Sequence, residues 1–493
     1  MLLGIAPRCL RLAICGFGVV VLAAACSGPS IEPGAFGWER CGQLECGSLA
    51  VPVDHDNING ETLELAVSRS RSEGTQHRGV LFLDSGGPGA SNRALLEDWV
   101  TSDAAELARL REVFDIVAVD ARGVGGSEPE FGCGENGEFQ DLVDEAGATP
   151  NESSEIAAGE AAIGLCVQQM GNATAQLGTG VIVRDLEAVR TALGEEQVFF
   201  FGYSFGSVVG AWYASEFPES VRLAVVDGAS PSQTSLPSFE QELAGFRQAF
   251  GPLEEEIQLM LSACADDTCP VFNDGDPTEI FVRAFDNGAL IDEEVGVAGA
   301  QIAAAFAPLR DRERWSDFYN GLDALDKGDA TPLAETVEGE FLQDDVENGS
   351  YVSHVLCLNF FGLNPELDRS GFTDSDRQTQ RLQTALEEEF PLIAQIQFSV
   401  EIGNPCRLFD SLDPPSFNVD FTGGNVPFLV VANRSDPITN FADSMEFTEQ
   451  LTDGHLVDVD FPRHTVFPDD ECVNAAVIAA LVDDMPLEAT LCE

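Results

Sequence analysis

The sequence predicts an α/β fold: a mostly parallel, twisted β-sheet with helices on both faces and a large, mostly helical insertion. Three observations support this prediction. Short apolar runs of strand length alternate with helical segments up to about residue 232. Over residues 235–415 the alternation stops and helical periodicity dominates, and from residue 426 the alternation resumes. A helical segment inserted into one α/β domain explains this order, because strands covered on both faces are continuous apolar runs.

Strands and helices are predicted from apolar runs, helical spacing and the turn residues that bound them. In the first half we expect strands at 47–53, 61–70, 79–84, 114–120, 197–203 and 221–227, and helices at 90–109, 182–193 and 206–216. In the second half we expect strands at 426–433 and 455–461 and a helix at 472–482. Within the insertion, helical spacing recurs at 240–250, 300–306, 312–325 and 376–389. The expected domains are a core of residues 38–234 and 416–493 and a helical cap of residues 235–415.

The N-terminus predicts export. Arg8 and Arg11 precede a short apolar stretch that ends in small residues, which is typical of a cleaved signal peptide rather than of a spanning helix. Residues 22–26 (LAAAC) resemble the end of a bacterial lipoprotein signal, in which Cys26 would carry a diacylglyceryl group. We therefore expect a signal peptide at 1–25, a tether at 26–37 and a cell-envelope protein that reaches the membrane only through its lipid anchor. The alternative is a secreted protein in which Cys26 is incidental.

Cysteine usage agrees with export. Ten of the 13 cysteines follow Cys26, and an even number in an exported protein predicts disulfides. Short spacings favour Cys41–Cys46 and Cys264–Cys269, and chain order then suggests Cys133–Cys166, Cys357–Cys406 and Cys472–Cys492. No Cys or His cluster has the spacing of a zinc site, so we expect neither a metal nor a cofactor.

The chain is strongly acidic, with a formal net charge of −59 and Lys327 as its only lysine. Such a surface repels nucleic acid and anionic lipid headgroups, so neither is an expected partner. The charge is interpreted as a solvated surface that keeps the protein soluble. An affinity for cationic substrates is the alternative.

Ser204 is the candidate nucleophile. It lies in GYSFG at residues 202–206, between a predicted strand and a predicted helix. A sharp strand-to-helix turn exposes such a serine above the sheet, and the flanking glycines relieve crowding there. The amide of Phe205, at the helix start, can then donate to an oxyanion. An ordinary serine in a glycine-bounded turn is the alternative.

A serine nucleophile needs a base, and the base needs an orienting acid. With this strand–turn–helix nucleophile the chain order is Ser, then Asp or Glu, then His. His464 follows the strand 455–461 and lies at the same sheet edge as Ser204, whereas His455 begins that strand at the opposite edge. Asp436 follows the strand 426–433 and is the candidate acid, with a turn-forming Asp before proline as the alternative.

Two glycine-rich segments follow predicted strands. DSGGPG at residues 84–89 lets the backbone approach a ligand closely, or forms a plain tight turn. DARGVGGS at residues 120–127 lacks the lysine and the spacing of a phosphate-binding loop. We interpret it as shaping the pocket, with an internal pair between Asp120 and Arg122.

These motifs, with SDP at residues 435–437 and the late His464, resemble the α/β-hydrolase branch of prolyl aminopeptidases. More narrowly, they resemble the secreted tripeptidyl-aminopeptidase-like proteins of actinobacteria. The resemblance runs from about Cys41 to the C-terminus, with its motifs in the core. It implies an α/β-hydrolase fold, the triad already named, and Gly87 with Phe205 as amide donors to the oxyanion. Ser85 stands where prolyl aminopeptidases usually have His, and Thr465 stands where Gly is common. The resemblance therefore does not determine which substrate the protein selects.

By this resemblance the substrate is a peptide with a free N-terminus, from which one or a few residues are released through an acyl-enzyme. Glu240 and Glu242 open the predicted cap and are candidates for binding the ammonium group, or they form a solvated helix face. A carboxylesterase or lipase with the same triad is the second interpretation. A non-catalytic lipoprotein that binds ligands on a hydrolase scaffold is the third, and the complete triad argues against it.

Overall fold

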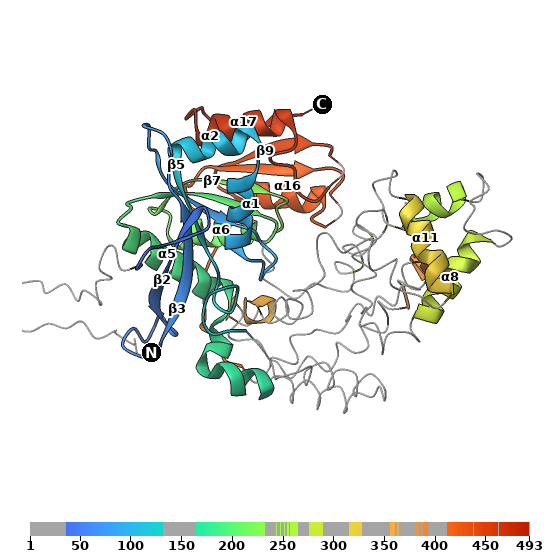
Figure 1. Cartoon of the computed structure of the whole chain (residues 1–493), viewed down its shortest axis with the longest axis horizontal. Coiled ribbons are helices and arrows are strands. Elements are labelled where there is room, and N and C mark those ends of the chain that lie inside the picture. Colours follow the sequence, from blue (N-terminus) through green and yellow to red (C-terminus); the bar gives the residue numbers. More distant parts are fainter. Residues whose placement is uncertain are drawn as a thin grey trace, which may run out of the picture.

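A ten-stranded, mostly parallel β-sheet forms the core of the protein (Figure 1). The computed structural model describes residues 36–131, 164–231, 412–436, 438–461 and 463–492, and parts of 243–392. The strands are β1 (Glu39–Cys41), β2 (Leu44–Pro52), β3 (Thr62–Ser70), β4 (Gly79–Asp84), β5 (Phe114–Val119), β6 (Val198–Tyr203), β7 (Val221–Asp227), β8 (Phe428–Asn433), β9 (Gly454–Val459) and β10 (Thr490–Leu491). Their order is β1-β2-β3-β5-β4-β6-β7-β8-β9-β10.

The strand directions bring the carboxyl ends of the central strands to one edge of the sheet. Pairing is antiparallel from β1 to β5 and parallel from β5 to β10. Asp84 at the end of β4 is in register with Gly202 near the end of β6, and Tyr203 is in register with Asp227 at the end of β7. Ligand sites of parallel sheets lie outside this edge.

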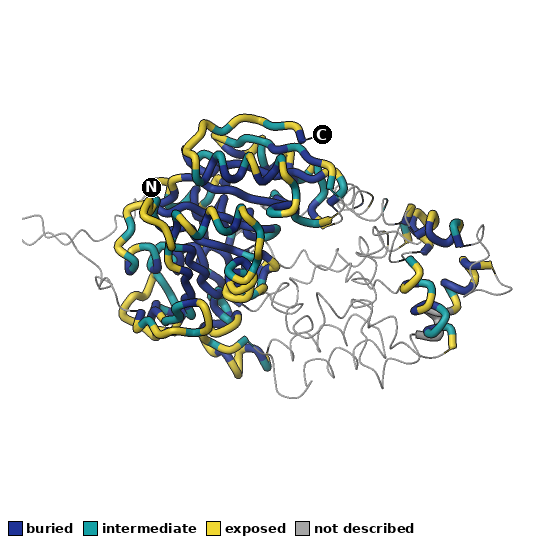
Figure 2. The backbone as a smooth tube through the Cα atoms, turned by 45° about the horizontal axis from the view of Figure 1, so that its top comes forward, coloured by how far each residue is buried: buried dark blue, intermediate teal, exposed yellow. Residues whose placement is uncertain are grey.

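Helices cover both faces of the sheet (Figure 1). They are α1 (Asn92–Thr101), α2 (Ala105–Val113), a 3₁₀ turn (Gly171–Gln176), α5 (Thr179–Leu193), α6 (Gly206–Glu216), α16 (Phe441–Gln450) and α17 (Glu471–Leu481). The apolar core on one face includes α5, α6 and α16, and the core on the other face includes α1, α2 and α17. The strands between them are buried on both sides (Figure 2).

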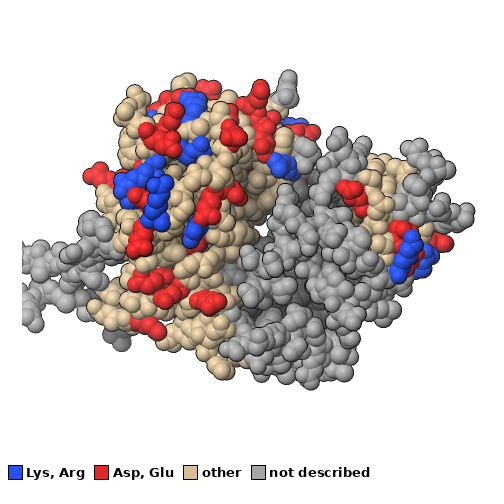
Figure 3. All heavy atoms as spheres, in the orientation of Figure 1, with Lys and Arg blue, Asp and Glu red and all other residues tan. Residues whose placement is uncertain are grey.

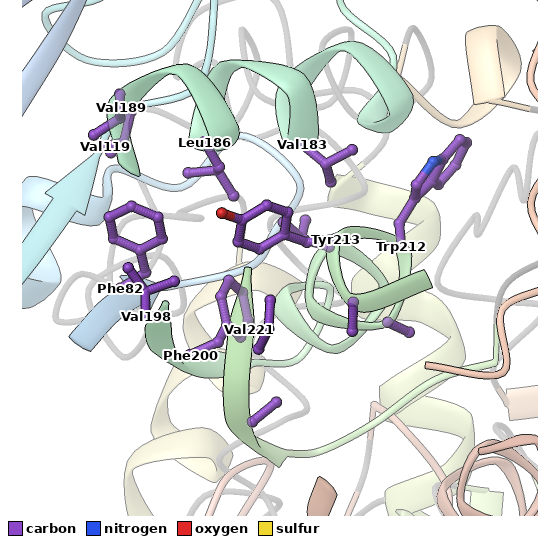
Figure 4. Packing of buried hydrophobic residues seen from close by; sticks show 14 of the residues in the cluster. Phe82, Val119, Val183, Leu186, Val189, Val198, Phe200, Trp212, Tyr213 and Val221 are labelled. Carbon is purple, nitrogen blue, oxygen red and sulfur yellow. The ribbon is translucent and has the colours of Figure 1, made fainter. Parts of the chain in front are cut away.

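The face under α5 shows how these layers pack. Val183, Leu186 and Val189 line one side of α5 and face Phe82 of β4 and Tyr213 of α6 (Figure 4). All are buried. Apolar residues recur along α5 at helical spacing, so one face of the helix enters the core, whereas Arg184, Glu187 and Arg190 are only partly buried.

Most predicted elements of the core are confirmed. The strands near 47–53, 61–70, 79–84, 114–120, 197–203, 221–227, 426–433 and 455–461 correspond to β2 to β9. The helices predicted at 182–193, 206–216 and 472–482 correspond to α5, α6 and α17. The α/β fold class is therefore correct.

The helix predicted at 90–109 is two helices. α1 ends at Thr101, and α2 begins at Ala105. Between them the Ser102 hydroxyl oxygen accepts a hydrogen bond from the Ala104 amide, and Ala104 is extended. Short polar side chains compete in this way with the helical hydrogen-bond pattern.

Little of the predicted cap lies within the described residues. Helices α8 (Pro277–Gly288) and α11 (Trp315–Asp326) are described, and α11 agrees with the helix expected at 312–325. An ion pair between Arg283 and Asp326 joins the two helices, which lie apart from the sheet in Figure 1. The predicted signal peptide, nearly all of the predicted tether and most of residues 235–411 lie outside the described residues.

Two of the predicted disulfides are present, Cys41–Cys46 and Cys472–Cys492. Cys166, Cys264 and Cys357 are also disulfide-bonded. Their predicted partners, Cys133, Cys269 and Cys406, lie outside the described residues.

On the face shown in Figure 3, acidic side chains lie over much of the described part of the sheet domain, and basic side chains lie beside many of them. Arg78, for example, pairs with Asp484, and Arg109 pairs with Asp483. In the part of the chain that the structure describes, no helix has both the length and the apolar character needed to span a membrane.

Candidate active site

Ser204 occupies a sharp turn between β6 and α6. Its φ is 51°, in the left-handed region that residues with a side chain rarely adopt. Its amide donates to the Asp227 carbonyl oxygen at 2.8 Å, which ties the turn to the end of β7. Backbone strain of this kind persists only where the surrounding structure enforces it, and it gathers at functional sites.

Glycines make this turn sterically feasible. A Cβ on Gly202 would lie 2.6 Å from the Gly206 carbonyl oxygen, and one on Gly86 would lie 2.4 Å from the Tyr203 carbonyl oxygen. Both distances are far shorter than a carbon–oxygen contact allows. The backbones of β6, α6 and the turn after β4 therefore approach more closely than any other residue type would permit.

The turn after β4 packs directly against Ser204. A Cβ on Gly86 would lie 3.1 Å from Ser204 Cβ and 3.0 Å from the Phe205 amide nitrogen. Gly87, with φ 102°, is the next residue. Among the described residues, neither the Gly87 amide nor the Phe205 amide has a hydrogen-bond acceptor. The Phe205 amide thus lies next to Ser204 at the positive end of α6, and the Gly87 amide follows the glycine that packs against Ser204.

His464 and Asp436 form a direct pair. His464 Nδ1 lies 2.9 Å from Asp436 Oδ1 and 3.0 Å from Oδ2. The carboxylate is fully buried and also accepts hydrogen bonds from the amides of Ile438 and Thr439 and from the Thr439 hydroxyl. Because a carboxylate only accepts, Nδ1 carries the hydrogen and Nε2 is left as an acceptor.

The His464 ring lies next to the Ser204 turn. A Cβ on Gly228 would lie 3.1 Å from His464 Cε1, and Gly228 follows the residue whose carbonyl oxygen holds the Ser204 amide. No hydrogen bond between Ser204 and His464 is present among the described residues. Such contacts are often long in unliganded sites and shorten when substrate binds.

Two buried carboxylates, on Asp84 and Asp227, flank β6, and neither is among the site residues predicted from the sequence. Burial raises the pKa of Asp84 to about 6 and that of Asp227 to about 7, although backbone amides donate to both. Asp84 accepts from the Gly86 amide, and Asp227 from the amides of Val466 and Phe467. A sequence signal exists, since each residue ends an apolar strand on either side of the Ser204 strand.

The predicted pair between Asp120 and Arg122 is wrong. The fully buried Arg122 guanidinium forms a bidentate pair with Asp185, which also binds His55. Asp120 instead accepts hydrogen bonds from the amides of Arg93 and Gly126. Asp185 lies on α5, and chain order alone does not reveal that this helix covers the loop after β5.

The remaining predicted residues lie elsewhere. His455 is near the start of β9, where it binds Asp453, so it is at the opposite edge from Ser204 as expected. Cys26, Glu240 and Glu242 lie outside the described residues.

The groups around Ser204 match those that acyl transfer requires: a half-buried hydroxyl, an imidazole whose Nδ1 is bound by a carboxylate, and amides that have no acceptor among the described residues. Together they can activate the hydroxyl, stabilise an oxyanion and protonate a leaving group.

The sequence matches known families in two regions. Residues 79–259 match the family described as alpha/beta hydrolase fold, and residues 403–486 match the family described as TAP-like protein. The first region contains Ser204, and the second contains Asp436 and His464.

Similar proteins occur in actinobacteria. The chain is 34% identical to the tripeptidyl aminopeptidase of Streptomyces coelicolor, over 90% of this chain and 81% of the relative. It is 28% identical to the serine protease Hip1 of Mycobacterium tuberculosis, over 89% and 85% of the two chains. It is 26% identical to the carboxylesterase B of the same species, over 94% of each chain. These relatives, together with the sheet order and the strained Ser204 turn, show the family of the chain. It belongs to the α/β-hydrolase family that includes the tripeptidyl aminopeptidase of Streptomyces coelicolor.

Proposed function

We propose that the protein is an exported serine aminopeptidase that releases single residues or short peptides from the free N-terminus of its substrates. The observation that carries this proposal is the pairing of His464 with Asp436 beside the strained Ser204 turn. The similarity to a tripeptidyl aminopeptidase and to a serine protease supports a peptide as the substrate.

The proposed reaction has two acyl-transfer steps. His464 Nε2 takes the proton of Ser204 as the hydroxyl oxygen attacks the scissile carbonyl carbon, and Asp436 stabilises the imidazolium that forms. The amides of Gly87 and Phe205 donate to the oxyanion, where one such donor is worth about 3–4 kcal/mol. The imidazolium then protonates the leaving amine. A water molecule, activated by His464, hydrolyses the acyl-enzyme and restores Ser204.

Substrate selection is assigned to the cap, residues 235–415. An aminopeptidase must recognise a free ammonium group, and Glu240 and Glu242 carry the required negative charge at the start of this segment. Replacing each with Gln should raise KM for peptides with a free N-terminus and leave KM for neutral esters unchanged. An equal effect on both substrates would contradict this assignment.

A carboxylesterase is the second candidate function, because a relative that aligns over 94% of both chains is named carboxylesterase B. The same triad serves both reactions, so substrates must separate them. The purified protein, residues 27–493, and its Ser204→Ala variant would be offered short peptide amides with free and with acetylated N-termini, beside short-chain esters.

The aminopeptidase proposal requires Ser204-dependent cleavage of the free peptides in preference to the acetylated ones. Cleavage of esters alone would favour the carboxylesterase. A folded protein without Ser204-dependent turnover at several salt concentrations would contradict both, and would favour a binding protein on a hydrolase scaffold.

We further propose that Cys26 is lipidated and anchors the protein to the outer side of the cell membrane. The signal-like residues 1–25 and the cysteine that follows them support this location. Cells expressing the full chain and its Cys26→Ser variant would be labelled with a clickable fatty acid. Label that depends on Cys26, together with release of the variant from the membrane fraction, is expected. Equal labelling of both proteins would contradict the anchor.

A further inference from the structure

Asp227 is bonded to both halves of the candidate active site. Its carbonyl oxygen accepts from the Ser204 amide at 2.8 Å. Its carboxylate Oδ2 accepts from the amides of Val466 and Phe467, each also at 2.8 Å. These two amides follow His464 by two and three residues, so one residue holds the turn of the nucleophile and the loop of the base.

Tyr203 holds the same loop from the neighbouring strand. Its hydroxyl donates to the Phe467 carbonyl oxygen at 2.8 Å. Phe467 is therefore bound at its N–H by Asp227 and at its carbonyl by the residue that precedes Ser204. The Phe467 ring also packs against Trp99 and Phe201. The segment after His464 thus has a fixed position relative to the ends of β6 and β7.

A carboxylate is a costly group at this position. Asp227 is fully buried, and its second oxygen, Oδ1, has no hydrogen-bond partner among the described residues. An unsatisfied buried polar atom costs roughly 1–3 kcal/mol. Packing alone would be served better by an apolar residue, whereas holding two adjacent amides requires an acceptor.

We propose that Asp227 is a positioning residue of the reaction: its carboxylate fixes the segment that follows His464 and so keeps the imidazole beside Gly228, in reach of Ser204. This inference rests on the proposed function, in which His464 is the base. Asp227 touches neither the substrate nor the imidazole in this role. It acts through the backbone of Val466 and Phe467.

Replacing Asp227 with Asn and with Ala separates the effect of the hydrogen-bond acceptor from the effect of the negative charge. In Asp227→Asn the amide oxygen still accepts from both backbone amides, and the NH₂ group occupies the place of the unpartnered Oδ1. In Asp227→Ala both hydrogen bonds are lost. A displacement of about 1 Å at a catalytic group can lower the rate by about 100-fold. We therefore expect Asp227→Ala to lower kcat by about 10- to 100-fold with KM nearly unchanged, and Asp227→Asn to restore kcat to within about fivefold of the wild type.

Loss of stability alone must be distinguished from loss of position. Leu65→Ala removes a fully buried side chain from β3, in the apolar core on the face of the sheet opposite to the core of Val466 and Phe467, and serves as the control. All variants would be compared by thermal unfolding, by kcat and KM, and by the rate at which a fluorophosphonate labels Ser204. We expect slow labelling and low kcat in Asp227→Ala, with both near wild type in Leu65→Ala at a similar loss of melting temperature.

The outcomes are separable. If Asp227→Ala unfolds, Asp227→Asn provides the test, because it keeps an acceptor for both amides. A folded Asp227→Asn enzyme whose kcat and labelling rate fall by far more than about fivefold would then overturn the proposal. Wild-type kcat in a folded Asp227→Ala protein would overturn it as well, while leaving Ser204 and His464 in their roles. A wild-type protein that neither turns over substrate nor labels at Ser204 would overturn the proposed function and this inference together.

Discussion

His464 lies against Gly228: a Cβ placed on this glycine would be 3.1 Å from the imidazole Cε1. The same Cβ would be 3.1 Å from the Thr439 hydroxyl, which binds Asp436. The candidate base and the threonine that binds its candidate acid are thus packed against a backbone position that has no side chain. The distances between the residues of the site therefore depend on residue 228 having no side chain.

Gly228→Ala should therefore displace the His464–Asp436 pair. We expect kcat to fall by about 10- to 100-fold, because a small misplacement of a catalytic group costs that much. The φ of Gly228 is 71°, so some cost in stability is also expected. Gly194→Ala is the matched control, since Gly194 has φ 80° and no atom within 4 Å of its Cβ position. Equal kcat in the two variants would argue against close packing at Gly228.

Gly86→Ala tests the contact between the turn after β4 and Ser204. The new Cβ would meet the Tyr203 carbonyl oxygen at 2.4 Å and the Phe205 amide at 3.0 Å. The turn must move, and with it the proposed oxyanion donors, so kcat should fall by about 100- to 1,000-fold. Gly42→Ala, at φ 65° with open space around it, is the control. The kcat of the folded variants, measured by steady-state kinetics, tests this prediction. A Gly86→Ala enzyme with wild-type kcat would contradict the Gly87 and Phe205 amides as oxyanion donors.

Thr439→Val removes one donor from the buried Asp436 carboxylate and keeps the shape of the side chain. Two backbone amides still hold Oδ1, but Oδ2 loses its 2.9 Å partner. A lost hydrogen bond to a buried charged group costs about 1.5–3 kcal/mol, so a fall in kcat of about 3- to 30-fold is expected if part of that cost falls on the transition state. Thr448→Val, which loses only a hydroxyl bonded within α16, should leave kcat unchanged. No difference between the two variants would contradict a role for Thr439.

The buried Asp84 carboxylate should make the free energy of unfolding of the protein depend on pH. Burial raises its pKa to about 6 in the folded state, so the folded protein binds this proton more tightly than the unfolded chain does. The stabilisation is complete below the unfolded pKa of about 3.9 and is lost as the pH rises through about 6. Asp84→Asn removes this titration and keeps an acceptor for the Gly86 amide.

The free energy of unfolding of Asp84→Asn, relative to that of the wild type, should therefore increase by on the order of 2 kcal/mol between pH 4 and pH 7. Denaturant titrations of both proteins at several pH values measure this difference. Parallel curves across the range would show that Asp84 titrates normally in the folded state.

The sheet was predictable because its strands are local features. α6 and β7 begin and end at the predicted residues, since glycines and polar residues bound continuous apolar runs there. The places of Ser204, Asp436 and His464 in the fold could be predicted for the same reason, because each follows a strand whose direction was clear. Chain order then brought all three to one edge of the sheet.

What could not be predicted depends on contacts between distant segments. α16 was missed because its sequence, FADSMEFTEQ, has few apolar residues, and its helix is supported by Phe447 in the core under β8. Arg122 pairs with Asp185, which lies 63 residues further along the chain. Asp227 binds amides more than 230 residues further along the chain, so its role becomes visible only in the folded protein.

The most direct test of the account is covalent labelling of the nucleophile. The wild type, Ser204→Ala and His464→Ala would be treated with a fluorophosphonate, and the adduct would be located by mass spectrometry of the digested protein. We expect one adduct in the wild type, on Ser204. It should be absent in Ser204→Ala and should form much more slowly in His464→Ala than in the wild type. An adduct on another residue, or equal labelling of wild type and Ser204→Ala, would contradict Ser204 as the nucleophile.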